Sequence, residues 1–253
     1  MKNDKHFYSF REIVQSLPKK KNSKSSLWVK TIVRKLSFVF TYLFVNLGIT
    51  PWTASVISAF VAAAGSILFA IDSNVCRIIG LVCIQLWLVL DCVDGNIARV
   101  TKHCSDMGDF IDTLSGYIVS AGAMLGIGIA AKNTTSFEIF QGTSLLIIMG
   151  ALGSIGNVLA RLIHQNYMVT LLRIEAKGES NLDNPDSDVD SERGLSYIRS
   201  RVDKELGISG VFMPLLIIAF VFGYLDIFTI LYGTFFIASA IMVAFYYGAK
   251  SKG

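Results

Sequence analysis

The stretch that decides the fold is LDCVDGNIARVTKHCSDMGDFIDTLSGY, residues Leu90–Tyr117. Two apolar runs meet in it and are joined by a short polar link, 100–107. Asp91, Asp94 and Asp112 lie inside these runs. Ionisable residues within membrane segments are costly, at about 2.5–3.5 kcal/mol for each central Asp, and they usually mark functional sites. The acids therefore predict a site rather than a purely structural role.

Helical spacing places these acids on two stripes. Residues three and four apart fall on one face of a helix, so Asp91 and Asp94 share a stripe, as do Asp109 and Asp112. The link 100–107 is short, which predicts antiparallel neighbouring helices with their acids opposite each other. Divalent cations such as Mg²⁺ and Mn²⁺ prefer hard oxygen ligands. The spacing therefore predicts a divalent-metal site between the two helices.

The composition is typical of a polytopic helical membrane protein. Of 253 residues, 53% are hydrophobic and 17% are charged, which is too apolar for one soluble domain. The net charge of +4 is modest and is concentrated near the N-terminus. This distribution favours an anionic membrane surface over nucleic acid as the partner. Residues 1–15 contain no apolar run, so no cleavable signal peptide is expected.

We predict an all-α fold with six transmembrane helices and an N-terminal interfacial amphipathic helix. Residues 1–49 form a basic tail and the juxtamembrane helix, and residues 50–253 form the transmembrane domain. An acidic polar loop is expected near 178–206, because its like charges and low hydrophobicity oppose burial. The six apolar runs are long enough to predict spans at about 51–71, 76–99, 108–131, from 143 past 161, 208–225 and 227–247.

In the juxtamembrane segment from residue 26 to 46, apolar residues recur at helical spacing and basic residues lie between them. Leu36 and Leu43 belong to its apolar face, whereas Lys30, Arg34 and Lys35 are expected on the opposite, solvated face. Such a helix lies on the membrane surface. Basic residues gather in this segment, beside the link 100–107, after the acidic loop and at the C-terminus. The positive-inside rule therefore places both termini and the proposed site in the cytoplasm.

The acidic stretch resembles the signature of the CDP-alcohol phosphotransferases, also called CDP-alcohol phosphatidyltransferases. That signature is D-x-x-D-G-x-x-A-R, then eight residues, then G-x-x-x-D-x-x-x-D. The last Asp of the signature falls on Gly116. The other seven positions match at the expected separations: Asp91, Asp94, Gly95, Ala98, Arg99, Gly108 and Asp112.

The resemblance implies a membrane transferase of phospholipid-type biosynthesis. It would move a substituted phosphate from a CDP-alcohol, such as CDP-diacylglycerol, to an acceptor alcohol and release CMP. Membrane lipids are expected partners, and the resemblance suggests a homodimer. It assigns two Mg²⁺ or Mn²⁺ ions to Asp91, Asp94 and Asp112, and the CDP moiety to Gly95, Ala98, Arg99 and Gly108.

Gly116 leaves the catalytic base open, because the last Asp of the family deprotonates the acceptor hydroxyl. Asp112 is a candidate catalytic residue, and Asp109, one turn away, is a candidate substitute base, as is His103. Arg161 follows nearly enough apolar helix to cross a bilayer. It is interpreted either as an interfacial anchor or as a phosphate contact.

Two functions of other classes stay open at this point. A relative without a base would bind metal and CDP and act as a regulator or binding protein. An ion transporter would use the acidic cluster for flux. The donor alcohol is not specified by these residues, and the acceptor is a polyol phosphate, an amino alcohol or a lipid. The four cysteines have no metal-ligand spacing, so they are interpreted as free thiols.

Overall fold

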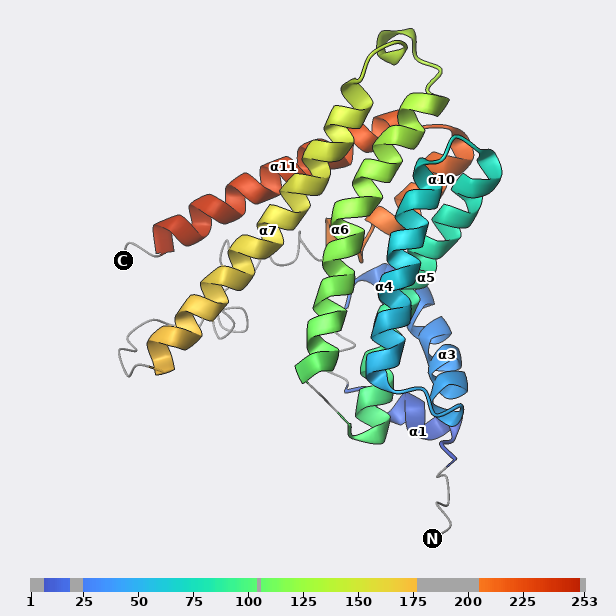
Figure 1. Cartoon of the computed structure of the whole chain (residues 1–253), viewed down its shortest axis with the longest axis vertical. Coiled ribbons are helices and arrows are strands. Elements are labelled where there is room, and N and C mark those ends of the chain that lie inside the picture. The colour runs from blue at the N-terminus through green and yellow to red at the C-terminus, as the bar shows by residue number, and fades with distance from the viewer. Residues whose placement is uncertain (1–6, 19–24, 104–105, 177–204, 251–253) are drawn as a thin grey trace.

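The computed structural model describes residues 7–18, 25–103, 106–176 and 205–250. Every regular element within these residues is helical, which confirms the all-α prediction (Figure 1). Three elements precede the long helices: α1 (Phe10–Gln15), the π-helical turn η1 (Val29–Val33) and α3 (Arg34–Asn46). The remaining elements are α4 (Pro51–Ala70), α5 (Asn74–Thr101), α6 (Asp106–Thr134), the 3₁₀ turn η2 (Glu138–Phe140), α7 (Leu145–Ala176), α10 (Phe212–Phe222) and α11 (Leu225–Lys250).

Five helices of the described residues are long and apolar enough to cross a membrane. They are α4, α5, α6, α7 and α11, and they correspond to the predicted first, second, third, fourth and sixth spans. The helix boundaries have local causes at several ends. At the start of α4, the Thr50 hydroxyl accepts a hydrogen bond from the Thr53 N–H at 3.2 Å, and Pro51 occupies the first helical position. The chain thus forms a polytopic helical membrane protein.

The predicted span at 208–225 is shorter in the structure than expected. α10 comprises only 11 residues, which rise about 16 Å, whereas the hydrocarbon core of a bilayer is about 30 Å thick. A turn at 207–211 delays its start, and Gly223, with a left-handed φ of 77°, ends it. In the described part of the chain, five of the six predicted spans are therefore helices of spanning length, and α10, in place of the predicted fifth span, is a shorter apolar helix.

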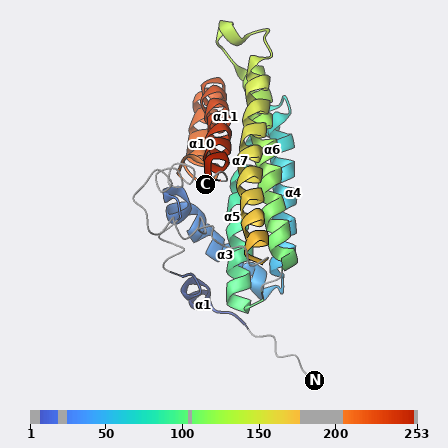
Figure 2. The ribbon, with the colours of Figure 1, turned by 90° about the vertical axis from the view of Figure 1, so that its left-hand side faces the viewer.

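The helix α4 packs along both α5 and α6, which run antiparallel and contact each other directly only to a small extent (Figures 1 and 2). Small residues permit this close packing. A Cβ built on Gly80 would lie 2.5 Å from the Phe69 nitrogen, and one on Gly126 would lie 2.5 Å from the Ser66 carbonyl oxygen. Side chains at either glycine would push α4 away from its neighbours.

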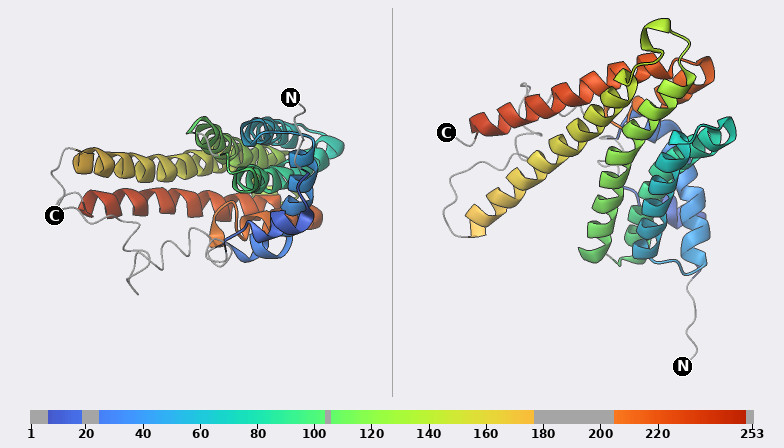
Figure 3. Two further views of the ribbon diagram at one scale, coloured as in Figure 1. Left: turned by 90° about the horizontal axis from the view of Figure 1, so that it is seen from below. Right: turned by 45° about the horizontal axis from the view of Figure 1, so that its top comes forward.

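The helices α7 and α11 run side by side and lead away from α4, α5 and α6 (Figure 3). Gly153 and Gly233 allow their backbones to approach, because a Cβ on Gly153 would lie 2.9 Å from the Gly233 Cα. Near the C-terminus, the Tyr247 hydroxyl lies 2.5 Å from His164 Nδ1, and the Tyr167 and Tyr247 rings lie 4.4 Å apart. His164 is therefore a helix-packing residue in this structure.

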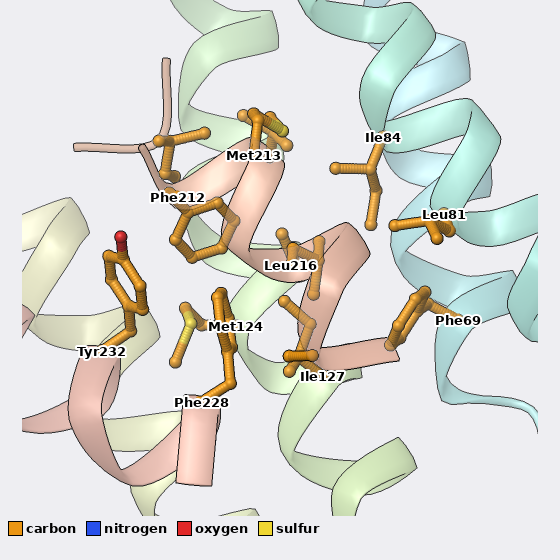
Figure 4. Close-up of a cluster of buried hydrophobic side chains, with 14 of the residues drawn as sticks. Phe69, Leu81, Ile84, Met124, Ile127, Phe212, Met213, Leu216, Phe228 and Tyr232 are labelled. Atoms are coloured by element: carbon orange, nitrogen blue, oxygen red, sulfur yellow. The ribbon is translucent and has the colours of Figure 1, made fainter. Parts of the chain in front are cut away.

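The main hydrophobic core lies where α10 meets the long helices (Figure 4). Phe212 and Leu216 of α10 are fully buried, and the Phe212 ring lies 4.8 Å from that of Tyr232 on α11. Met124 of α6 and Ile84 of α5 contribute to the same cluster. Within a membrane, such packing stabilises the fold through van der Waals contacts rather than through removal of apolar surface from water. α10 therefore serves as a core element that joins the two groups of helices.

The juxtamembrane segment forms η1 and α3, as predicted, but Arg34 is not on its solvated face. Leu36 and Leu43 are 46% and 49% exposed, which suits an apolar face toward lipid. The opposite face packs on α5 through Ser37 and Thr41, both fully buried. Arg34 precedes Ser37 by one turn, so it lies on the same face and is only 6% exposed.

Parts of the predicted organisation lie outside the described residues. Most of the expected acidic loop, 178–206, is among them, so its role and the domain boundaries at 1–49 and 50–253 stay predictions. Three of the four cysteines are described, and none of these three (Cys76, Cys83 and Cys92) forms a disulfide.

Candidate functional site

A cavity of about 310 Å³ lies between α5, α6, the η1–α3 segment and the turn before α10. Its wall is acidic on α5 and α6 and contains hydroxyls and one buried guanidinium on the side of the N-terminal segment. The lining residues are Ser25, Ser26, Val29, Arg34, Leu88, Asp91, Cys92, Asp94, Gly95, Arg99, Asp112 and Ser209. The cavity thus combines residues from four separate segments of the chain.

The structure brings the three signature acids together on this cavity. Asp91 and Asp94 come from consecutive turns of α5, and Asp112 comes from the second turn of α6. The Asp91 carboxyl lies within range of electrostatic interaction with the carboxyls of Asp94 and Asp112. The same side chain lies within electrostatic reach of Arg161 on α7. Four ionisable groups from three helices therefore lie close together at one place.

Asp94 is held in one orientation by its neighbours. Ser55 of α4 donates a hydrogen bond to Asp94 Oδ2 at 2.6 Å, and the Gly95 N–H donates to Asp94 Oδ1. Asp94 is only 5% exposed. A buried carboxylate is stable only when its oxygens are hydrogen-bonded or bind a cation. Ser55 was not among the predicted site residues, because its contact with Asp94 joins residues 39 positions apart.

Arg99 is braced by a second polar chain that runs to α3. Its Nη2 donates to Asn96 Oδ1 at 2.6 Å, and Asn96 Nδ2 donates to the hydroxyls of Ser37 and Thr41 at 3.2 and 3.1 Å. Asn96 is fully buried. Gly95 leaves room for this arrangement, because a Cβ there would lie 3.3 Å from Arg99 Nη1. Asn96 stands at an unspecified position of the signature, so the sequence contained no signal for it.

The other predicted residues lie outside the cavity lining. Asp109 and His103 are exposed, and Ala98 and Gly108 are partly buried near the helix ends without lining the cavity. Arg161 does not line it either, yet its guanidinium is close by. A Cβ built on Gly116 would lie 2.6 Å from Arg161 Nη1. The space beside the last signature position is therefore occupied by an arginine side chain.

The carboxylates fit a divalent cation by donor chemistry, since all three supply hard oxygen ligands. In the described part of the chain, however, no three His, Cys, Asp or Glu side chains are already grouped to hold a metal ion. The metal assignment of Asp91, Asp94 and Asp112 stays a prediction.

The fold and site define a class: a polytopic helical membrane protein with an acidic cavity between its second and third long helices. The family model described as CDP-alcohol phosphatidyltransferase matches residues 31–177, more than half of the chain. The matched region begins within η1 and ends at residue 177, directly after α7. It includes Asp91, Asp94 and Asp112. The chain belongs to the CDP-alcohol phosphatidyltransferase family. A comparison with curated proteins found no match.

Membership in this family supports transfer of phosphoryl groups from CDP-alcohols, with membrane lipids among the partners. The family is generally dependent on divalent metals. The five long apolar helices indicate an integral membrane protein.

Proposed function

We propose that the chain is a membrane transferase of phospholipid-type biosynthesis that moves the substituted phosphate of a CDP-alcohol to an acceptor hydroxyl and releases CMP. The observation that carries this proposal is the convergence of Asp91, Asp94 and Asp112, from two helices, on one cavity of about 310 Å³. CDP-diacylglycerol is one donor that fits a lipid-embedded site. The bracing of Asp94 and Arg99 adds support, because phosphoryl transfer relies mainly on positioning and charge neutralisation.

The acids are the proposed metal ligands. Asp91, Asp94 and Asp112 would hold Mg²⁺ or Mn²⁺, with two ions expected from the family resemblance. When bound, the ions would neutralise the diphosphate of the donor and the charge that develops on departing CMP. Ser55 restricts the rotation of Asp94, which reduces the entropy lost on binding.

Gly95 and Arg99, which line the cavity, form the proposed contact for the CDP moiety beside the acids. Ala98 and Gly108, which the family resemblance also assigns to the CDP moiety, are proposed to make room for it from outside the lining. The Arg99 guanidinium is held by Asn96, so its remaining N–H groups are oriented before a phosphate arrives. Such pre-orientation lowers the entropic part of a reaction barrier. Arg161 is a proposed second phosphate contact, next to Gly116.

The proposed proton acceptor is Asp112. It lines the cavity, whereas Asp109 is exposed and does not line it. The acceptor oxygen forms a bond to the phosphorus that carries the donor alcohol, and the bond from that phosphorus to the oxygen of CMP breaks. The hydroxyl proton passes to Asp112, and CMP leaves with the electron pair of the broken bond. Asp109 is retained as the alternative base.

One observation favours a second candidate function. The Arg161 guanidinium lies where a side chain at position 116 would begin, so the place of the last signature Asp is taken by a cation, which cannot accept the proton of an acceptor hydroxyl. A protein of this kind would bind CDP and metal and act as a regulator or binding protein without turnover.

The deciding experiment measures CMP release by the full-length protein in lipid nanodiscs, with Mg²⁺ or Mn²⁺ and a panel of CDP-alcohols and acceptors. We expect release that depends on metal and acceptor and is lost in Asp112→Asn. The matched control is Glu138→Gln, which changes an exposed carboxylate in the link between α6 and α7. Metal-dependent CDP binding without release for any pair would select the second candidate, and no CDP binding would contradict both.

The topology is part of the same proposal: the cavity and both termini face the cytoplasm, and the protein forms a homodimer. Lys102→Cys, at an exposed position where α5 ends, should react with a membrane-impermeant maleimide only from the cytoplasmic side. Labelling from the outside would invert the assignment. Mass measurement of the native complex in nanodiscs tests the dimer.

A further inference from the structure

Arg34 is a buried cation on the cavity for which the proposed chemistry has no role so far. Its side chain is 6% exposed and lines the cavity from the start of α3. Nη2 donates to the Ser25 hydroxyl at 2.9 Å. Nε is buried and has no hydrogen-bond partner among the described residues. No carboxylate of the described residues forms an ion pair with this guanidinium.

A buried charge without a counter-charge is unfavourable, because water is removed and nothing replaces its stabilisation. Arg34 shares a cavity with three acids but is paired with none of them. Arg99, the other arginine on the lining, differs because Asn96 already accepts from it. Because no carboxylate of the described residues pairs with Arg34, its position on the cavity points to an anionic group that arrives with a ligand.

The surroundings of Arg34 suit a phosphate. Ser25, Ser26 and Ser209 line the same cavity as Arg34. Ser26 donates to the Ser209 carbonyl at 2.7 Å, which connects the N-terminal segment to the turn before α10. A guanidinium combined with hydroxyl groups is a common arrangement for binding phosphate oxygens.

We propose that Arg34 binds a phosphate group carried by the acceptor, so that the acceptor is a phosphorylated polyol rather than a neutral alcohol or an amino alcohol. The proposal rests on the transferase function proposed above. Arg34 comes from α3, whereas the acids and Arg99 that would hold the CDP diphosphate come from α5 and α6. Two phosphate-bearing substrates can therefore be held by different elements of one cavity. An amino alcohol would bring a second cation toward Arg34, which is unfavourable.

The test compares Arg34→Met with Arg34→Lys and the matched control Lys35→Met, in full-length protein. Lys35 is the adjacent residue of the same helix and is exposed. Binding of glycerol 3-phosphate and of CDP, each with Mg²⁺, is measured calorimetrically, so the readout does not require turnover. The acceptor KM is then measured with glycerol 3-phosphate, inositol phosphate, glycerol, inositol and ethanolamine.

We expect Arg34→Met to weaken glycerol 3-phosphate binding and raise its KM by about 10- to 100-fold, as for loss of a charged hydrogen bond. CDP affinity should change less than about twofold. Arg34→Lys should recover part of the loss, and Lys35→Met should match the wild type. Thermal unfolding of Arg34→Met should be close to that of the wild type, because the substitution removes a buried charge that pairs with no carboxylate in the described part of the chain.

Three results would overturn the proposal. The first is equal use of neutral and phosphorylated acceptors by the wild type. The second is an equal loss of CDP binding in Arg34→Met, which would assign Arg34 to the donor. The third is unchanged glycerol 3-phosphate binding in Arg34→Met, including the case in which the wild type does not bind it. Absence of CMP release with every acceptor would instead contradict the transferase function, while the binding comparison would still decide the role of Arg34.

Discussion

The guanidinium of Arg161 on α7 lies against Gly116 of α6, so closely that a Cβ on Gly116 would come within 2.6 Å of Arg161 Nη1. Gly116 is the position at which the family signature has its last aspartate. The absence of a side chain on α6 is thus matched by the presence of a long cationic side chain from another helix. The two residues should be studied as a pair.

Gly116→Asp should restore a carboxylate that pairs with Arg161 instead of acting as a base. We therefore expect little gain in CMP release from this substitution alone. Combination with Arg161→Met should free the carboxylate. The double variant should then release CMP up to about 100-fold faster than Arg161→Met alone, which is the lower end of the range for general-base catalysis. The measurement is CMP release by both single variants and the double variant. A full gain in Gly116→Asp alone would show that Arg161 does not restrain position 116.

Ser55→Ala should weaken metal-dependent CDP binding without removing it. The variant loses the hydrogen bond to Asp94 Oδ2 but keeps the carboxylate, and loss of such a supporting contact typically costs about 10- to 100-fold in metal affinity. Asp94→Asn should abolish the binding. Titration of CDP at fixed Mg²⁺ measures both effects, and Ser136→Ala, at an exposed position far along the chain, is the control. Unchanged binding in Asp94→Asn would remove Asp94 from the metal site.

Asn96→Ala should weaken both the protein and its nucleotide site. It removes the acceptor for Arg99 and the donor to Ser37 and Thr41. We expect the free energy of unfolding to fall by about 1–3 kcal/mol and CDP affinity to fall about tenfold. Thermal unfolding and CDP titration measure the two changes. The control is Asn133→Ala, which changes an exposed asparagine in the last turn of α6 and should alter neither stability nor CDP affinity. Lower stability with normal affinity would limit Asn96 to a structural role.

Gly128→Ala should separate α6 from α7, because the added Cβ would lie 2.6 Å from the Leu146 carbonyl oxygen, a backbone atom that cannot move alone. Overpacking of this kind costs about 1–3 kcal/mol, so the unfolding temperature should fall. Gly248→Ala is the matched control, since a Cβ there meets nothing within 4 Å. That change should be neutral or stabilising by up to about 1 kcal/mol. Equal behaviour of the two variants would contradict close α6–α7 packing at Gly128.

The sequence by itself determined the helical membrane class and the acidic stretch. Both depend on local properties: the length of apolar runs, and the helical period that places Asp91 and Asp94 on one face. The same reasoning brought Asp112 to these acids, because a short link leaves few arrangements for two helices. The length of α10 was not predictable from hydrophobicity, since a buried core helix and a short span have similar compositions.

Only the tertiary structure decided which polar residues support the site. Ser55 reaches Asp94 across 39 positions, and Asn96 reaches Ser37 across 59, so no local pattern encodes either contact. Arg34 lies in a run of basic residues typical of a solvated face, and it is buried because it lies on the same face of α3 as Ser37 and Thr41, the face that packs on α5. Contacts of this kind depend on how whole helices pack, and packing is a property of surfaces brought together by the fold rather than of neighbouring residues in the chain.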